Sequence, residues 1–140
     1  MTNATAPAAA IGRLLLSAIF LLSGVNKLTA AAATQGYIAS AGLPFPEIAY
    51  WVAVLVEIGG GLLLLVGYQT RLAAAALALF TVAAAFGFHA KFGDQNQFIH
   101  FMKNIAIAGG LLQVFAFGAG SFSLDGRSGR NAPLGRAAVA

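Results

Sequence analysis

The sequence contains no cysteine. Disulfides, dithiol redox chemistry, thiolate-bound zinc or iron–sulfur centres and the Cys-x-x-Cys-His attachment of haem are therefore excluded for this chain. Charge is scarce as well, because only 9% of the 140 residues are Asp, Glu, Lys or Arg, whereas about a quarter are charged in an ordinary soluble domain. So few charged groups cannot cover a water-exposed globule, and the composition indicates a membrane protein.

Two kinds of partner are disfavoured by what is missing. The net charge is +4, but the basic residues stand singly or in the final segment. No basic stripe interleaved with aromatic residues is present, so we expect no nucleic-acid partner. His89 and His100 could in principle be axial ligands of haem. However, no carboxylate is placed to orient either ring, and we expect no metal.

Apolar residues are abundant instead and make up 59% of the chain. A helix needs about 20 mostly apolar residues to cross the hydrocarbon core of a bilayer. Four windows meet that requirement: residues 9–28, 46–67, 72–90 and 98–118. We therefore predict an all-α membrane protein, a four-transmembrane-helix bundle that forms a single domain over residues 1–125. We expect residues 126–140 to be a basic, flexible tail.

The positions of the basic residues predict that both termini are cytoplasmic. One side carries five arginines. They are Arg13 in the N-terminal segment, Arg71 in the turn between the second and third windows, and Arg127, Arg130 and Arg136 in the tail. The opposite side carries only Lys27, Lys91 and Lys103. Arg13 is expected to extend along its helix toward the cytoplasmic surface. The first window also resembles a signal peptide, but we expect it to be retained.

Glu57 interrupts the most apolar stretch of the chain, VAVLVEIGGGLLLLVG from Val52 to Gly67. An isolated carboxylate in hydrocarbon would cost several kcal/mol or would take up a proton. Because helical side chains lean toward the N-terminus, Glu57 is expected to meet Lys27 and His89 in the outer half of the bilayer. We predict that Glu57 faces the bundle interior, pairs with Lys27 or Lys103, and forms the floor of an outward-facing pocket.

Further polar residues are candidates for ligand binding at the same level. Three of them share one face of the fourth window at spacings of three and four, namely His100, Lys103 and Asn104. Tyr50 lies seven residues before Glu57 and shares its helix face. Glu57 is also the candidate proton relay, and no residue is assigned as catalytic.

Structural roles are the alternatives for the same residues. Lys27 could have no role beyond neutralising the carbonyl end of its helix. The two histidines could simply contact lipid headgroups at the membrane interface. Glu57 could pair for structural reasons alone. Three glycines are expected to let helices approach closely, and they are Gly24, Gly60 and Gly61.

Four stretches carry a family resemblance: GRLLLSAIFLLSGVNKL, YIASAGLP, VEIGGGLLLLVGYQTRLAA and FMKNIAIAGGLL. They resemble the DoxX family of small bacterial membrane proteins, and SFSLDG near the end resembles the usual ending of that family. The resemblance covers about residues 12–125 and includes the charged positions Lys27, Glu57 and Lys103. It implies a four-helix bundle in the bacterial inner membrane.

The resemblance also implies quinone-linked redox chemistry, since the family name is tied to oxidoreductases such as the thiosulfate:quinone type with its DoxD subunit. In this hypothesis Lys27, Lys103 or His89 binds a carbonyl of a non-covalent quinone. The alternative is a non-catalytic accessory subunit that anchors a larger membrane complex, with other redox subunits or a second copy as partners. A proton or small-solute transporter is disfavoured, because there is no inverted repeat and few polar residues lie in the inner half. A family can supply the fold, but function must be argued from a site.

Overall fold

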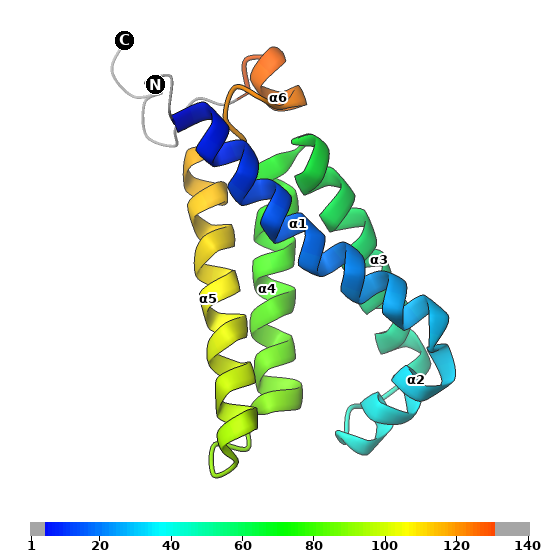
Figure 1. Cartoon of the computed structure of the whole chain (residues 1–140). Coiled ribbons are helices and arrows are strands. Elements are labelled where there is room, and N and C mark those ends of the chain that lie inside the picture. The colour runs from blue at the N-terminus through cyan, green and yellow to red at the C-terminus, as the bar shows by residue number, and fades with distance from the viewer. Residues whose placement is uncertain (1–4, 131–140) are drawn as a thin grey trace.

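The computed structural model describes residues 5–130. Its helices, in chain order, are α1 (Thr5–Thr29), α2 (Ala31–Ser40), α3 (Pro46–Val66), α4 (Thr70–His89), α5 (Gln95–Phe117) and α6 (Leu124–Arg127) (Figure 1). Four of them, α1, α3, α4 and α5, are long and apolar enough to cross a membrane. The predicted all-α fold with four spans is therefore confirmed.

Local signals explain where the spanning helices begin and end. Pro46 stands in the first turn of α3, where a missing backbone N–H does no harm. Gly67 ends α3 in the left-handed conformation, with a φ of 68°. Asp94 caps α5 by accepting from the backbone N–H groups of Asn96 and Gln97 at 2.8 and 3.3 Å. This cap explains why α5 starts before its predicted window.

Helix α2 was not predicted, because its ten residues are too few and too mixed in polarity to span a bilayer. It follows α1 after a break at Ala30, whose backbone leaves the helical conformation. Ile38 is the buried residue of α2, and it packs against Tyr50 and Val54 of α3. The segment between the first two predicted windows therefore contains a short helix at one end of the bundle (Figure 1).

The four spans pack as two pairs. Helix α1 lies along α3, and α4 lies along α5, while the pairs meet mainly where α3 passes α4. Helices α1 and α5 touch little. In Figure 1 the α1–α3 pair leans away from the α4–α5 pair toward the end that carries α2. We call that end the α2 end, and we call the opposite end, which carries α6, the α6 end.

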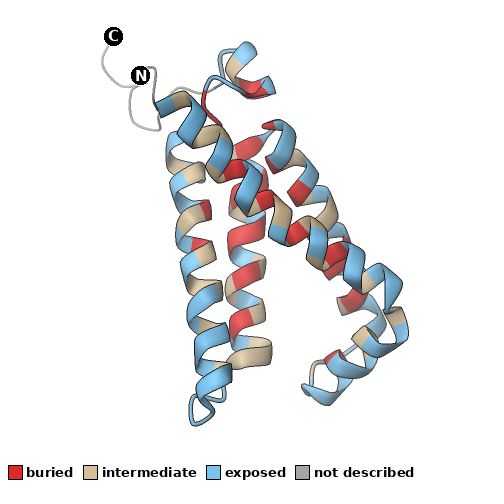
Figure 2. Cartoon of the chain, viewed as in Figure 1, coloured by how far each residue is buried: buried red, intermediate tan, exposed pale blue. Residues whose placement is uncertain are grey.

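The hydrophobic core lies between the two pairs. Its buried side chains include Phe20 of α1, Leu64 of α3, Leu77 of α4 and Leu111 of α5. Figure 2 shows buried residues mainly on the sides of the helices that face one another, with exposed residues on the outside. Many of the exposed residues are large and apolar, as expected for helices that face lipid rather than water.

Three close helix contacts depend on glycine. A Cβ atom at Gly24, Gly60 or Gly61 would lie 3.0 Å or less from a side-chain carbon of a neighbouring helix. The respective neighbours are Ile58, Leu77 and Leu21. Gly24 and Gly61 thus bring α1 and α3 together, and Gly60 brings α3 and α4 together. These are the three glycines expected to allow close packing.

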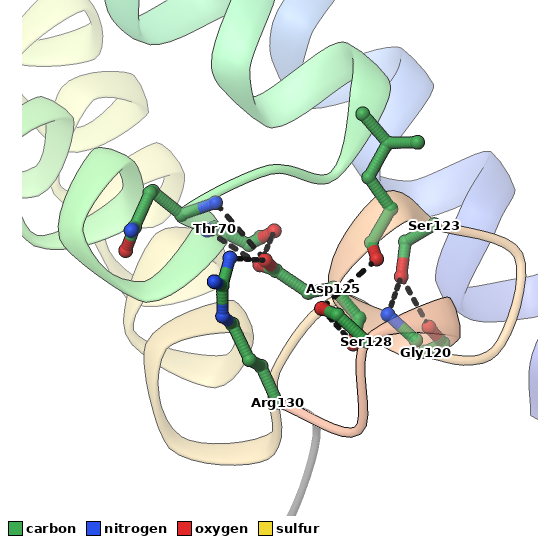
Figure 3. A network of polar contacts seen from close by, with 9 residues as sticks. Thr70, Gly120, Ser123, Asp125, Ser128 and Arg130 are labelled. Atoms are coloured by element: carbon green, nitrogen blue, oxygen red, sulfur yellow. Dashed lines mark hydrogen bonds and ion pairs between the residues drawn. The ribbon is translucent and has the colours of Figure 1, made fainter.

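A polar network joins α6 to the start of α4 (Figure 3). The carboxylate of Asp125 accepts from the backbone N–H and the hydroxyl of Thr70 at 2.8 and 2.7 Å, and from the backbone N–H of Gln69 at 3.1 Å. Gln69 provides no capping side chain for α4, so Asp125 satisfies the free N–H groups from a distant part of the chain. Arg130 approaches the same carboxylate at 3.9 Å.

This network changes the predicted domain boundary. Residues 126–130 belong to α6 and the turn that follows it, so a boundary after residue 125 would cut through a short helix. Ser123 caps this helix by accepting from the backbone N–H of Gly126 at 2.9 Å. The rest of the predicted flexible tail, residues 131–140, lies outside the described residues.

Asp125 is expected to make stability depend on pH at the acidic end. Burial opposes its ionisation, but the hydrogen bonds from Thr70 and Gln69 and the charge of Arg130 outweigh burial and lower the pKa of the carboxyl. A group whose pKa is lowered by folding stabilises the fold above its unfolded pKa of about 3.9. That contribution is lost as the pH falls through the folded pKa.

We therefore expect Asp125→Asn to lower the free energy of unfolding by about 1.5–3 kcal/mol at pH 7, since it removes hydrogen bonds to a charged acceptor. The difference from the wild type should shrink below pH ~4. Thermal unfolding in detergent micelles between pH 7 and pH 3 measures both quantities. Asp94→Asn is the matched control, because asparagine caps a helix as well as aspartate. A difference for Asp125→Asn that stays constant across this range would contradict the prediction.

Candidate functional site

Glu57 is buried between α3 and α1, and 5% of the residue is exposed. The Nζ atom of Lys27 lies 2.9 Å from Oε2 and 3.0 Å from Oε1 of the carboxylate. The acid in the apolar stretch therefore meets a cation from another helix. Of the two lysines considered, it pairs with Lys27 and not with Lys103.

Two further side chains hold this ion pair. The hydroxyl of Ser23 donates to Oε1 of Glu57 at 3.1 Å and accepts from Lys27 at 2.8 Å. Ser23 lies one helical turn before Lys27, so both reach α3 from the same face of α1. The phenol of Tyr50 donates to the backbone carbonyl of Lys27 at 3.2 Å. Tyr50, a candidate for ligand binding, thus positions the last turn of α1.

The ammonium is the accessible member of the pair. The side chain of Lys27 is 24% exposed, whereas that of Glu57 is 6% exposed. An ammonium has three N–H donors, and two of them bind Ser23 and Oε1 of Glu57. Oε2 is close but accepts no well-aligned hydrogen bond from the described residues. Nζ of Lys27 therefore has three acceptors within 3.0 Å, and its exposed side is the part of the pair that an outside acceptor can approach.

A cavity of about 720 Å³ adjoins the ion pair between the two helix pairs. Ser23, Lys27 and Glu57 line it, together with apolar side chains of α1–α5. The apolar lining includes Phe20, Ile38, Val52, Phe80, Phe88 and Ile107. Its volume lies within the roughly 300–1,000 Å³ typical of small-molecule sites. The ion pair is thus a polar group in the wall of a mostly apolar cavity.

His89 lines the same cavity from the end of α4. Its Nδ1 atom lies 2.8 Å from Oε1 of Gln97, and its ring stacks on that of His100 with 5.2 Å between the centroids. His100 itself is exposed and is not among the residues that line the cavity. Within residues 5–130, no three His, Asp or Glu side chains gather where they could bind a metal ion.

Helix α5 contributes only one of its three predicted residues. Asn104 lines the cavity, whereas Lys103 is exposed and lies outside it. The physical reason is that successive residues of a helix point about 100° apart. The three residues His100, Lys103 and Asn104 therefore span too large an angle around α5 to line one cavity together. The α5 residues that line the cavity are Asn104 and Ile107.

Several lining residues were missed because α2 was not expected. Thr34, Tyr37 and Ile38 of α2 all contribute to the cavity wall. The ring of Tyr37 stacks on that of Phe88 in α4, with 5.3 Å between centroids and 16° between planes. Ser23 was also missed, although its position four residues before Lys27 was a signal in the sequence.

Arg13 forms a second buried polar cluster at the α6 end. Its guanidinium donates to the carbonyls of Leu64 and Leu65 at 2.8 and 3.1 Å. It also donates to those of Ala119 and Phe122 at 2.9 and 2.6 Å. The residue is only 4% exposed, so the prediction that it extends to the membrane surface is wrong. Arg13 instead satisfies carbonyls at the end of α3 that no helical N–H can reach.

The interior between the two polar clusters is apolar. Phe20, Leu64, Leu77 and Leu111 occupy it. Ser17 is buried nearby, but its hydroxyl donates to the carbonyl of Leu14 in its own helix. The described residues therefore provide no continuous polar route from the Glu57 pair to the Arg13 cluster, which counts against a transport path.

Comparison with known proteins identifies the family. Residues 8–90 match the DoxX family model. The chain belongs to the DoxX family. The match extends from α1 to the end of α4 and includes Lys27, Glu57 and His89.

Two relatives from Escherichia coli (strain K12) cover most of this DoxX chain. Inner membrane protein YqjF is 37% identical over 115 residues, which cover 82% of this chain and 87% of the relative. Inner membrane protein YphA is 34% identical over 124 residues, with 84% and 87% covered. No solved structure matches the chain. Together with the four candidate spans, these relatives make the protein a DoxX family integral inner-membrane protein.

Proposed function

We propose that this DoxX family protein is a quinone-linked redox module whose cavity takes up a quinone from the surrounding lipid. The observation that carries the proposal is the partly exposed ammonium of Lys27 on the wall of an apolar cavity. A quinone ring is flat and apolar and accepts hydrogen bonds only at its carbonyl oxygens. Its chemistry therefore matches one accessible donor in otherwise hydrophobic surroundings.

The residues of the pair have distinct roles in this proposal. Lys27 donates to a carbonyl of the ring and holds it in place. Glu57 holds the ammonium of Lys27 in position through the ion pair. A bound quinone supplies a carrier of two electrons and two protons. Glu57 and Lys27 are placed to exchange the protons, and the electrons come from a partner redox subunit.

The proposed orientation puts the N-terminus and the α6 end on the cytoplasmic side. The support is the distribution of basic residues. Arg71, Arg127 and Arg130 lie at the α6 end, while Lys91 and Lys103 lie toward the α2 end. Arg13 carries less weight in this count because it is buried against carbonyls. In this orientation the cavity lies in the outer half of the bilayer.

Quinone-dependent stabilisation of the purified protein tests the proposal. We expect decylubiquinone or 2-methyl-1,4-naphthoquinone to raise the melting temperature in detergent, because a ligand at 100 times its Kd stabilises a protein by about 2.7 kcal/mol. The double variant Lys27→Met/Glu57→Gln removes the donor and leaves no buried carboxylate without a partner. It should show no quinone-dependent rise in melting temperature. Lys103→Met changes an exposed lysine outside the cavity and should keep it. If the wild type shows no shift and no quinone in its extracted lipid, the proposal fails.

An anchoring role without chemistry is the competing hypothesis, and it makes the opposite prediction. In that case the double variant would retain physiological activity, whereas changes on the lipid-facing surface would prevent assembly with a partner. Activity that depends on Lys27 and Glu57 in an assembled complex would favour the redox module.

A further inference from the structure

Asn104 is a polar side chain without a hydrogen-bond partner in the part of α5 that faces the cavity. No hydrogen bond joins its carboxamide to any residue between 5 and 130, and it lines the cavity beside Ile107. A carboxamide has two N–H donors and a carbonyl acceptor. Such a group is seldom left unpaired in apolar surroundings, so its presence indicates a ligand or an ordered water.

Asn104 and Lys27 approach the cavity from different helix pairs. Lys27 belongs to the α1–α3 pair, and Asn104 belongs to the α4–α5 pair. Both line the same cavity of about 720 Å³. Because α1 and α5 touch little, the space between the pairs is open to a ligand that faces both groups.

Asn104 is also the free donor on its side of the cavity. The hydroxyl of Thr81 in α4 already donates to the carbonyl of Leu77 at 2.7 Å. Nδ1 of His89 lies 2.8 Å from Oε1 of Gln97, and because an amide oxygen only accepts, this contact assigns the tautomer with N–H at Nδ1. Its Nε2 is then an acceptor. A ligand oxygen that needs a donor on this side therefore meets Asn104.

We infer that the cavity is a two-point site for a 1,4-dioxygenated ring, with Lys27 binding one ring oxygen and Asn104 binding the other. The inference rests on the proposed function and names the class of ring that the site selects. A para-quinone carries its two acceptors on opposite edges, so it can connect the two helix pairs. A lipophilic ligand with one carbonyl can satisfy only one of the two donors.

A comparison of two probes on the full-length protein in detergent tests this inference. The first probe is 2-methyl-1,4-naphthoquinone, and the second is 2-methyl-1-tetralone, which has a similar bicyclic body and one carbonyl. We expect the wild type to bind the dione about five- to tenfold more tightly, as one additional hydrogen bond provides. Asn104→Leu should bind both probes equally, with its affinity for the single ketone unchanged. Titration of the melting temperature or calorimetry measures the affinities.

Gln113→Leu is the matched control, because Gln113 is an exposed amide on the same helix outside the cavity. It should keep the preference for the dione. Asn104→Ala provides a second variant if leucine disturbs packing, and it should also lose the preference. If both Asn104 variants still prefer the dione as the wild type does, the two-point site is wrong while quinone binding stands. If the wild type binds neither probe, the proposed function itself fails.

Discussion

Lys27→Met should lower the free energy of unfolding by about 3–5 kcal/mol, the usual effect of removing one partner of a buried ion pair. The loss is large because Glu57, whose side chain is 6% exposed, cannot turn to water once the ammonium is gone. The reverse change, Glu57→Gln, should be milder. Lys27 is 24% exposed and can keep part of its hydration.

A double variant separates two contributions to the free energy of unfolding. One is the penalty for leaving a buried carboxylate without a partner, and the other is the net contribution of the ion pair. Lys27→Met/Glu57→Leu removes both charges and should recover most of the stability lost by Lys27→Met, since apolar replacements of buried pairs are often neutral. Lys103→Met should change stability by less than about 0.5 kcal/mol, as exposed substitutions usually do. Thermal unfolding in micelles, or titration with a denaturing detergent, measures each variant. A loss for Lys27→Met no larger than for Lys103→Met would show that the carboxylate does not depend on this partner.

Arg13→Met should lower the free energy of unfolding by about 3–5 kcal/mol as well, because it leaves several buried carbonyls without donors. The guanidinium donates to carbonyls on α3 and on the segment that leads to α6. Arg13→Lys should recover less than half of the lost free energy of unfolding, since an ammonium cannot replace the planar array of N–H donors of a guanidinium.

Proteolysis provides a local measurement of the same effect. Without Arg13, the segment around Ala119 and Phe122 loses its contact with α1. Trypsin should then cleave faster after Arg127 and Arg130, both of which are exposed. Arg127→Met is the matched control for stability, because Arg127 is exposed on α6. If Arg13→Met neither destabilises the protein nor speeds cleavage, the carbonyl contacts do not hold the α6 end together.

The two buried clusters show how the bundle is organised. The guanidinium of Arg13 directs four hydrogen bonds to backbone carbonyls, so this cluster joins parts of the fold to one another. The Lys27 cluster is partly exposed and faces a cavity. This difference is the reason for placing the ligand at the α2 end and a structural role at the α6 end.

The number and type of the spans could be predicted from the sequence because both depend on local composition. About 20 apolar residues in a row have few stable states other than a membrane helix. The need for a partner near Glu57 was also predictable, since a lone carboxylate in hydrocarbon is too costly whatever the fold. These conclusions require no knowledge of how the helices are arranged.

The identity of the partners was decided only by the tertiary structure. Whether Lys27 or Lys103 reaches Glu57 depends on helix rotation, and a change of one residue turns a side chain by about 100°. Arg13 and Asp125 bind backbone groups far away in sequence, and backbone groups leave no pattern in a sequence. The cavity itself exists because α1 and α5 diverge, and divergence is a property of packed pairs rather than of any single helix.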